Sequence, residues 1–218
     1  ELSETICGLM PLQHGTVEID GKSIAHKSIH AIRAMGVGMV HEDRMIYGVS
    51  NPQPIEENLI SDRYATEPYS KRGVMNYKYI REWSKERIKE FKVKCDGPEA
   101  PVKTLSGGNV QKVVVGREFD YEPDLLIMNQ PTRGIDVGAI EFIRKKIVDM
   151  RSRKKAILLV SADLSEILSL SDTILVMHEG RIVGHISDVK NTSENELGLY
   201  MLGVKEDSKE QIGGAYCE

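Results

Sequence analysis

The sequence predicts an α/β fold built on a mostly parallel sheet. Four short segments are almost wholly apolar, and stretches in which apolar residues recur every three or four positions separate most of them. Strands that are apolar on both faces and alternate with helices are typical of a parallel sheet covered by helices on both sides. The four predicted strands are residues 37–40, 124–128, 156–160 and 173–177.

Helical spacing is clearest in residues 137–151, where Ile140, Ile143, Ile147 and Met150 fall on one face. Residues 76–93 show a similar pattern, with a predicted buried face of Ile80, Trp83, Ile88 and Phe91. Further helices are predicted at the start of the chain and over residues 110–119 and 164–170.

The remaining segments carry turn and loop signals. Val17 and Ile19 alternate with polar residues ahead of Asp20-Gly21, which predicts a hairpin. Residues 45–58 contain two prolines and are predicted to form a loop. The polar residues 205–218 are expected to form a flexible tail.

Composition limits the classes of function. The chain has 218 residues, enough for one sizeable domain, and a net charge of −4, which argues against a dedicated nucleic-acid binder. No apolar run approaches the roughly 20 residues that span a bilayer, so a membrane role would need a separate partner. Cys7, Cys95 and Cys217 form no CxxC pair, and the six histidines lack metal-ligand spacing, so no metal site is expected.

The strongest chemical signal is the loop Leu-Ser-Gly-Gly-Asn at residues 105–109, directly ahead of a predicted helix. Glycines let a ligand approach the backbone, and a helix N-terminus presents free N–H groups and a positive dipole end to an anion. Ser106 adds a hydroxyl that can donate to a phosphate oxygen. The alternative is that Ser106 only caps the helix and the glycines only turn the chain.

Residues 105–132 resemble, without a gap, the signature-to-Walker-B segment of ATP-binding-cassette (ABC) proteins. Residues 133–136 occupy the D-loop position of that family, Glu42 the Q-loop position and Ala162 the position of the switch histidine. The resemblance implies an ABC-type P-loop NTPase core with an antiparallel β subdomain over residues 1–204, truncated before its first helix. It also implies an inserted helical subdomain at about residues 52–120.

A closer resemblance is to the second cassette of tandem sugar importers. Three features carry it: Glu42-Asp43-Arg44, the Asn that ends the signature, and the run from Pro131 to Ala139. The variant Gln-Pro-Thr-Arg-Gly that begins at Gln130 leans towards the nucleoside branch of these importers.

The sequence departs from the family where hydrolysis is performed. It contains no P-loop motif GxxxxGK[ST], which holds the phosphates. Asn129 and Gln130 replace the acidic Walker B pair, and amides can neither take a proton nor balance the charge of a divalent cation. Ala162 replaces the switch histidine. We therefore expect this cassette's own site to be non-hydrolytic.

The retained signature is expected to serve the nucleotide of a partner cassette, fused upstream or dimeric, with ATP and Mg²⁺ shared between the two. The residues expected to bind nucleotide in trans are Leu105, Ser106, Gly107, Gly108, Asn109 and Gln111. Glu42, Asp43 and Arg44 are expected to couple the cassette to a transmembrane permease, and Asp136 either acts at the dimer interface or caps a helix.

The function implied is import of a ribose- or galactose-like sugar or of a nucleoside, on the cytoplasmic face of the cell membrane. A solute-binding protein would take part indirectly, and no nucleic acid is expected. The alternatives are a soluble ABC protein acting on DNA or the ribosome, and an active ATPase whose P-loop lies outside this sequence. The first would carry coiled-coil arms or basic linkers, which the sequence lacks, and the amide pair argues against the second.

Overall fold

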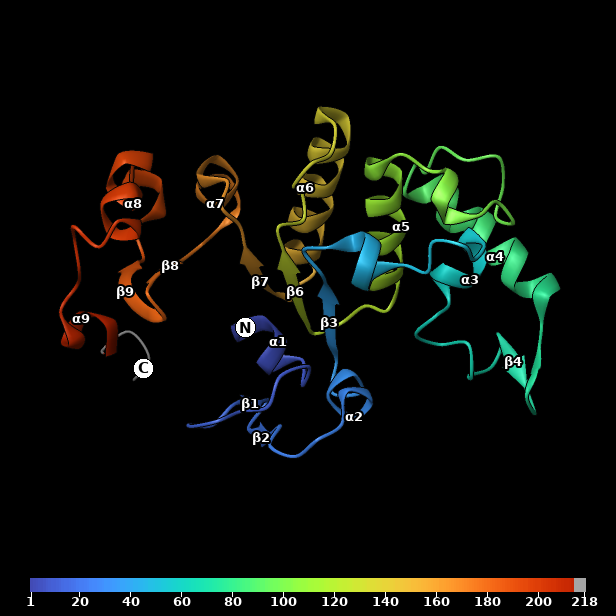
Figure 1. The fold of residues 1–218 in the computed structure, drawn as a ribbon, viewed down its shortest axis with the longest axis horizontal. Helices are drawn as coiled ribbons and strands as arrows, with labels where there is room; N and C mark the ends of the chain where they lie inside the picture. The colour runs from blue at the N-terminus through green and yellow to red at the C-terminus, as the bar shows by residue number, and fades with distance from the viewer. Residues whose placement is uncertain (214–218) are drawn as a thin grey trace. The chain divides into compact units, whose positions relative to one another are not determined.

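The computed structural model describes residues 1–213 and forms two compact units, Glu1–Val160 and Ser161–Glu218 (Figure 1). The first unit contains a three-stranded parallel sheet in the order β3-β6-β7. All of β3 is buried, as is the centre of β6, which confirms the prediction of apolar strands in a parallel sheet. These strands are Val37–Val40, Leu125–Asn129 and Ala156–Val160.

Helix α5 (Gly107–Asp120) lies between α6 (Val137–Ser152) and the helices α3 and α4, and it also packs on β3 (Figure 1). Most of its residues are buried, because neighbours surround it on several sides. Helix α6 buries Ile143, Ile147 and Met150 on one face, as its spacing predicts.

The amino-terminal elements pack near β3, the strand at one edge of the sheet. They are α1 (Leu2–Ile6), the hairpin of β1 (Glu18–Ile19) and β2 (Lys22–Ser23), and α2 (Ile29–Arg33). Their core brings Cys7, Ile24 and Ile32 against Met39 and Ile127. The predicted hairpin is confirmed, with its turn at Asp20-Gly21.

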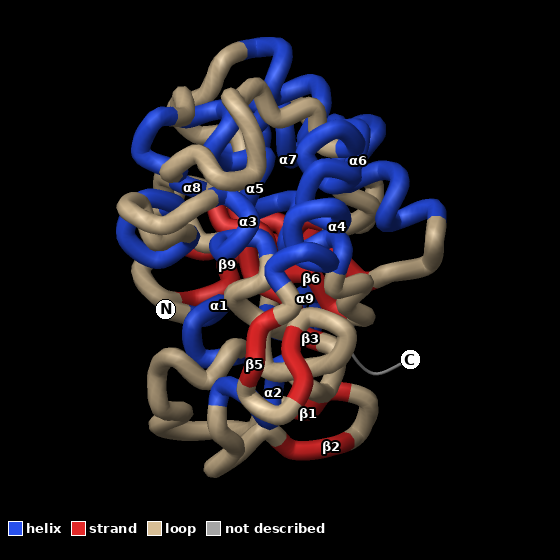
Figure 2. Tube along the Cα trace, turned by 90° about the vertical axis from the view of Figure 1, so that its right-hand side faces the viewer, coloured by secondary structure: helices blue, strands red, loops and turns tan. Residues whose placement is uncertain are grey.

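The helical part contains α3 (Ile55–Leu59), α4 (Tyr77–Glu90) and one short hairpin, β4 (Ser70–Lys71) with β5 (Val74–Met75) (Figure 2). The half-buried Trp83 packs against the cluster of Ile60, Tyr69 and Ile80. That a separate helical subdomain spans about residues 52–120 stays a prediction.

The prediction of a loop over residues 45–58 is wrong in part. Residues Arg44–Gly48 form a π-helical turn, η1, and α3 begins directly after Pro54. Asp43 initiates η1, because its carboxylate accepts from the backbone N–H groups of Met45 and Ile46. Proline lacks an N–H but tolerates the start of a helix, so Pro54 opens α3 rather than breaking it.

The second unit begins with α7 (Leu164–Leu170), at its predicted position. Strand β8 (Ile174–His178) pairs antiparallel with β9 (Arg181–Ile186), so no parallel neighbour of β8 is found among the described residues. A 3-10 helical turn, η3 (Val189–Asn191), and two α-helices follow, α8 (Glu194–Met201) and α9 (Lys209–Gly213).

That residues 205–218 form a flexible tail stays a prediction, although Asp207 is hydrogen-bonded to other parts of the second unit. The Asp207 carboxylate accepts from the Tyr200 hydroxyl at 2.6 Å and from the His185 backbone N–H at 2.9 Å. These bonds fix the segment against β9 and α8. The rest of the expected tail, residues 214–218 with Cys217, lies outside the described residues.

A network of buried ion pairs joins the elements of the first unit. Arg33 on α2 pairs with Glu118 on α5 at 2.9 Å and with Asp62 at 2.7 Å. Arg117 pairs with Glu118 at 2.9 Å, and Arg63 pairs with Asp62 at 2.9 Å. Because the Glu118 and Asp62 side chains are only 1% and 8% exposed, each must keep its partners in the folded state.

The pKa of Asp62 reflects this pairing. Burial alone would raise the pKa of the carboxyl, but the hydrogen bonds and charges of Arg63 and Arg33 outweigh burial and hold the pKa below its ordinary value. The carboxylate form is therefore the stabilising one.

Replacing Asp62→Asn should lower the free energy of unfolding at pH 7 by about 1–3 kcal/mol, because two buried guanidinium groups lose a charged acceptor. The folded-state pKa lies below the unfolded value near 3.8. The contribution of Asp62 is thus complete above that value and is lost as the pH falls through the folded pKa. Urea unfolding at pH 7, 5 and 3 should show the difference between wild type and variant shrinking with acidity.

The matched control is Glu122→Gln, which removes a carboxylate from an exposed pair with Arg153. It should leave the urea midpoint unchanged at every pH. If Glu122→Gln lowered the free energy of unfolding as much as Asp62→Asn, the buried ion pairs would contribute no more to stability than exposed ones.

Candidate functional site

Ser106 occupies the N-cap position of α5, but its side chain makes no hydrogen bond to the helix backbone. Its Oγ instead accepts from Asn109 Nδ2 at 2.9 Å, and Asn109 Oδ1 accepts from the Lys94 backbone N–H at 2.9 Å. The interpretation of Ser106 as only a helix cap is therefore wrong. Its exposed hydroxyl lies beside the first N–H groups of α5, those of Gly107 and Gly108, an arrangement that suits an anion.

The two glycines of the loop are needed for close packing. A Cβ on Gly107 would lie 2.8 Å from Arg44 Nη2, and a Cβ on Gly108 would lie 2.6 Å from Asp136 Oδ2. Real Cβ atoms do not approach so closely. The start of α5 is thus in contact with two segments far away in the sequence, the residues after β3 and the start of α6.

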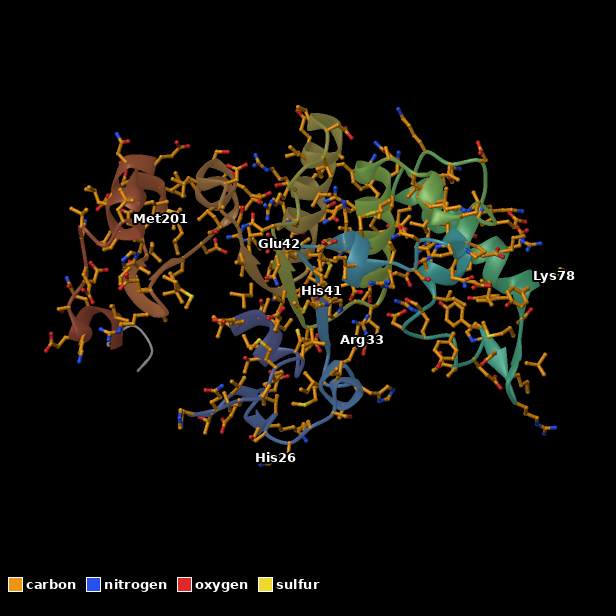
Figure 3. All side chains as sticks on the ribbon, viewed as in Figure 1. His26, Arg33, His41, Glu42, Lys78 and Met201 are labelled. Carbon is orange, nitrogen blue, oxygen red and sulfur yellow. The ribbon has the colours of Figure 1, made fainter. Side chains whose placement is uncertain are left out.

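The segment after β3 is attached to the loop after β6. Arg44 Nη1 donates to the Arg133 carbonyl at 3.0 Å, and Arg44 Nη2 donates to the Gly134 carbonyl at 3.2 Å. The Glu42 carboxylate, beyond the carboxyl end of β3 (Figure 3), forms an ion pair with the Arg133 guanidinium. Next to Glu42, burial lowers the pKa of the His41 imidazole, which favours the neutral ring at pH 7.

Two amides stand at the carboxyl end of β6. Asn129 Nδ2 donates to Ser3 Oγ at 2.9 Å, and Asn129 Oδ1 is buried with no partner among the described residues. Gln130 has a φ of +48° and its backbone N–H donates to the Val160 carbonyl at 2.7 Å. A neutral amide cannot balance the charge of Mg²⁺ or deprotonate water, so these two positions do not fit a magnesium-assisted hydrolytic site.

The remaining predicted residues lie around the same helix end. Gln111 is 1% exposed and donates through Nε2 to the Pro131 carbonyl at 2.8 Å, so it holds the loop after β6 and is not open to a ligand. Asp136 caps α6 by accepting from the Ala139 N–H at 3.0 Å, and its expected role at a dimer interface stays a prediction. Leu105 is half-buried at the entry to α5.

Twelve of the thirteen predicted site residues lie in the first unit. Ala162 belongs to the second unit. Sequence reasoning missed the partners of these residues, chiefly Ser3 and the carbonyls of Arg133 and Gly134. No sequence signal marks them, because backbone carbonyls are present at every position and Ser3 lies 126 positions from Asn129.

The parallel sheet, the antiparallel strands and the loop at the start of α5 define an ATP-binding cassette. A family model described as "ABC transporter" matches residues 1–133, more than half of the chain. The chain belongs to the ABC transporter family.

Solved structures agree on the fold. A dimeric structure of MJ0796, an ABC transporter cassette, has a TM-score of 0.70 and 19% identity, covering 84% of this chain and 78% of that one. A nucleotide-free ATP-binding cassette from an ABC transporter has a TM-score of 0.67 and 18% identity, covering 100% of this chain and 83% of that one.

Curated relatives are more similar in sequence. The guanosine import ATP-binding protein NupO of Bacillus subtilis is 40% identical over 98% of this chain and 42% of its own length. The nucleoside import ATP-binding protein NupA of Lactococcus lactis is 40% identical over 93% of this chain and 40% of its own length. The ribose import ATP-binding protein RbsA of Bacillus licheniformis is 36% identical over 91% of this chain and 40% of its own length. The chain spans about two fifths of the length of these relatives.

Residues 1–213 offer neither a membrane-spanning helix nor a cluster of metal ligands. None of their helices is both long and apolar enough to cross a bilayer. The same residues contain no group of three or more His, Cys, Asp or Glu side chains placed to hold a metal ion.

Replacing Gly108→Ala should destabilise the protein by about 1–3 kcal/mol, because the added Cβ meets a carboxylate that is fixed as the cap of α6. Thermal unfolding measures the effect. Gly138→Ala is the control, since its Cβ would lie 3.4 Å from the same Asp136 side chain, an ordinary contact. Alanine inside a helix is favoured over glycine, so Gly138→Ala should keep or raise the Tm. Equal Tm values for the two variants would refute the close packing of α5 on Asp136.

Proposed function

We propose that this chain is the second cassette of a tandem ABC import ATPase for nucleosides or for ribose- or galactose-like sugars. Its own nucleotide site does not hydrolyse ATP, and its signature loop serves the ATP held by the partner cassette. The observation that carries the proposal is the combination of an open signature loop at α5 with two amides at the end of β6. The match to about two fifths of the length of import ATP-binding proteins supports a tandem arrangement.

Nucleosides are the favoured class of solute. The nucleoside import proteins share 40% identity with this chain, whereas the ribose and glucose import proteins share 36%. The Gln-Pro-Thr-Arg-Gly variant that begins at Gln130 also favours a nucleoside as the solute.

This chain would supply hydrogen-bond donors that bind and position the ATP of the partner cassette. The Ser106 hydroxyl and the N–H groups at the start of α5 would donate to the phosphates of ATP bound on the partner's P-loop. Mg²⁺ would be held by residues of the partner. The chain itself would contribute no general base, because Gln130 cannot accept a proton and Ala162 presents only a methyl group.

The permease contact is proposed for the turn η1 after β3. Met45, Ile46 and Tyr47 are consecutive apolar residues with exposed fractions of 42%, 69% and 68%. Beside them is a hollow of about 130 Å³ whose lining includes Leu9, Ile29 and Tyr47. An exposed apolar turn beside a hollow suits an apolar segment of another protein. The chain would thus work on the cytoplasmic face of the membrane, with the solute-binding protein acting only through the permease.

In the complete transporter that contains this chain, Ser106→Arg should lower ATP hydrolysis at least about 100-fold, because a bulky cation fills the space of the partner's phosphates. Steady-state release of phosphate in proteoliposomes measures this. Ser152→Arg is the matched control, since Ser152 is exposed at the carboxyl end of α6, where a helix dipole favours a cation. It should keep the wild-type rate.

The same assay tests the degenerate site through Gln130→Ala. Hydrolysis should continue at the wild-type rate, since Gln130 has no catalytic task in the proposal. A loss comparable to that of Ser106→Arg would mean that this cassette's own site is active, and the proposal would fall.

Ile46→Glu should weaken association of the ATPase subunit with its permease about tenfold or more, because a charge replaces an apolar side chain in the buried contact. Co-purification and surface plasmon resonance with the permease in nanodiscs measure the affinity. Val74→Glu, at an equally exposed apolar position on β5, should bind normally. Equal affinity of both variants would place the permease contact elsewhere.

A further inference from the structure

Arg44 lies where three segments of the first unit meet. Its guanidinium donates to the carbonyls of Arg133 and Gly134, and Nη2 occupies the space that a Cβ on Gly107 would need. The residues that it contacts lie 63 to 90 positions from Arg44 in the sequence. Arg44 therefore joins the start of α5 to the loop after β6 from the side of η1, in addition to the bond that Gln111 makes to the Pro131 carbonyl.

The position of the guanidinium is not the result of attraction to α5. A helix N-terminus carries partial positive charge and disfavours a neighbouring cation. The two carbonyls therefore hold the guanidinium in place, and the missing side chain of Gly107 makes room for it. Its Nε is buried and has no hydrogen-bond partner among the described residues, so the two terminal nitrogens carry the polar contacts.

The base of Arg44 is attached to an exposed turn. Arg44 is the first residue of η1, whose N–H groups are held by the Asp43 carboxylate. At the other end of η1, the Gly48 carbonyl accepts from Arg117 Nη1 at 2.9 Å. The turn is thus anchored to α5 at Gly48, while Arg44 reaches the start of the same helix.

We infer that Arg44 is a positioning residue that transmits movement of η1 to the signature loop. Displacement of Met45–Tyr47 moves Arg44, which changes the spacing between Gly107 and the Arg133–Gly134 backbone. This inference rests on the proposed function, because the signature loop matters for hydrolysis only if it serves a partner's ATP.

The experiment uses the complete transporter with Arg44→Ala and two readouts. Hydrogen–deuterium exchange should rise about tenfold or more at residues 106–110 and 132–136, because two hydrogen bonds from a charged group are lost. The kcat for ATP hydrolysis should fall about tenfold through misplacement of the loop. The KM for ATP should change less than about twofold, since the partner's P-loop carries most of the binding.

Two further variants sharpen the experiment. Arg153→Ala removes an exposed arginine from the same unit and should alter neither readout. Gly107→Ala should push Nη2 off the Gly134 carbonyl and raise exchange at 132–136 as Arg44→Ala does. The double variant should then show no further rise, because both changes remove the same contact.

The outcomes separate this inference from the proposed function. Unchanged exchange in Arg44→Ala, or additive effects in the double variant, overturns the positioning role. Raised exchange with a normal kcat also overturns it, provided that Ser106→Arg abolishes hydrolysis in the same preparation. If Ser106→Arg hydrolyses ATP normally, the proposed function fails, and the exchange data alone decide whether Arg44 positions the loop.

Discussion

The buried carboxylate of Glu118 is the constraint on which the rest of the first unit depends. It is held by Arg33 from α2 at 2.9 Å and by Arg117 from α5 at 2.9 Å, and it accepts weakly from the Met39 N–H of β3 at 3.4 Å. A buried charge that loses its partners costs several kcal/mol, roughly 3–5 in typical cases. Helix α5 therefore cannot slide along or rotate against β3 without breaking these contacts.

Glu118 also affects the candidate site, because the site residues belong to the two elements that Glu118 connects, β3 and α5. Glu42 and Arg44 follow β3 directly, and Ser106 and Gly107 begin α5. Glu118 fixes the last turn of α5 against β3, and because the helix is continuous from Gly107 to Asp120 this also restricts where its start can lie. The short contacts at Gly107 and Gly108 then become geometric requirements, because the surrounding side chains have little room to move.

The sequence predicts the strands and the long helices well because their signals are local. Segment 156–160 is apolar throughout, and α6 follows its three-and-four spacing from Ile143 to Met150. The loop prediction over 45–58 failed because prolines and polar residues mark the start of a helix as well as a turn, and only the cap of Asp43 or the position of Pro54 separates the two cases. The partners of Arg44 could not be predicted, since they are carbonyls 89 and 90 positions away.

The same contacts show which residues of the signature loop bear on function. Packing accounts for Gly108, whose Cβ would meet Asp136 and Ala139, and Gly107 leaves room for the Arg44 guanidinium, so neither glycine needs a ligand to explain it. Asn129 has a structural partner in Ser3, whose Oγ accepts from its Nδ2, while its Oδ1 is buried with no partner among the described residues. Ser106 differs from all of these: it is exposed, it occupies a cap position and yet it does not cap. The Ser106 hydroxyl accepts only from Asn109 Nδ2 within the same loop and makes no bond to the helix backbone. Its exposure at the start of α5 makes this residue the strongest support for the proposed ligand.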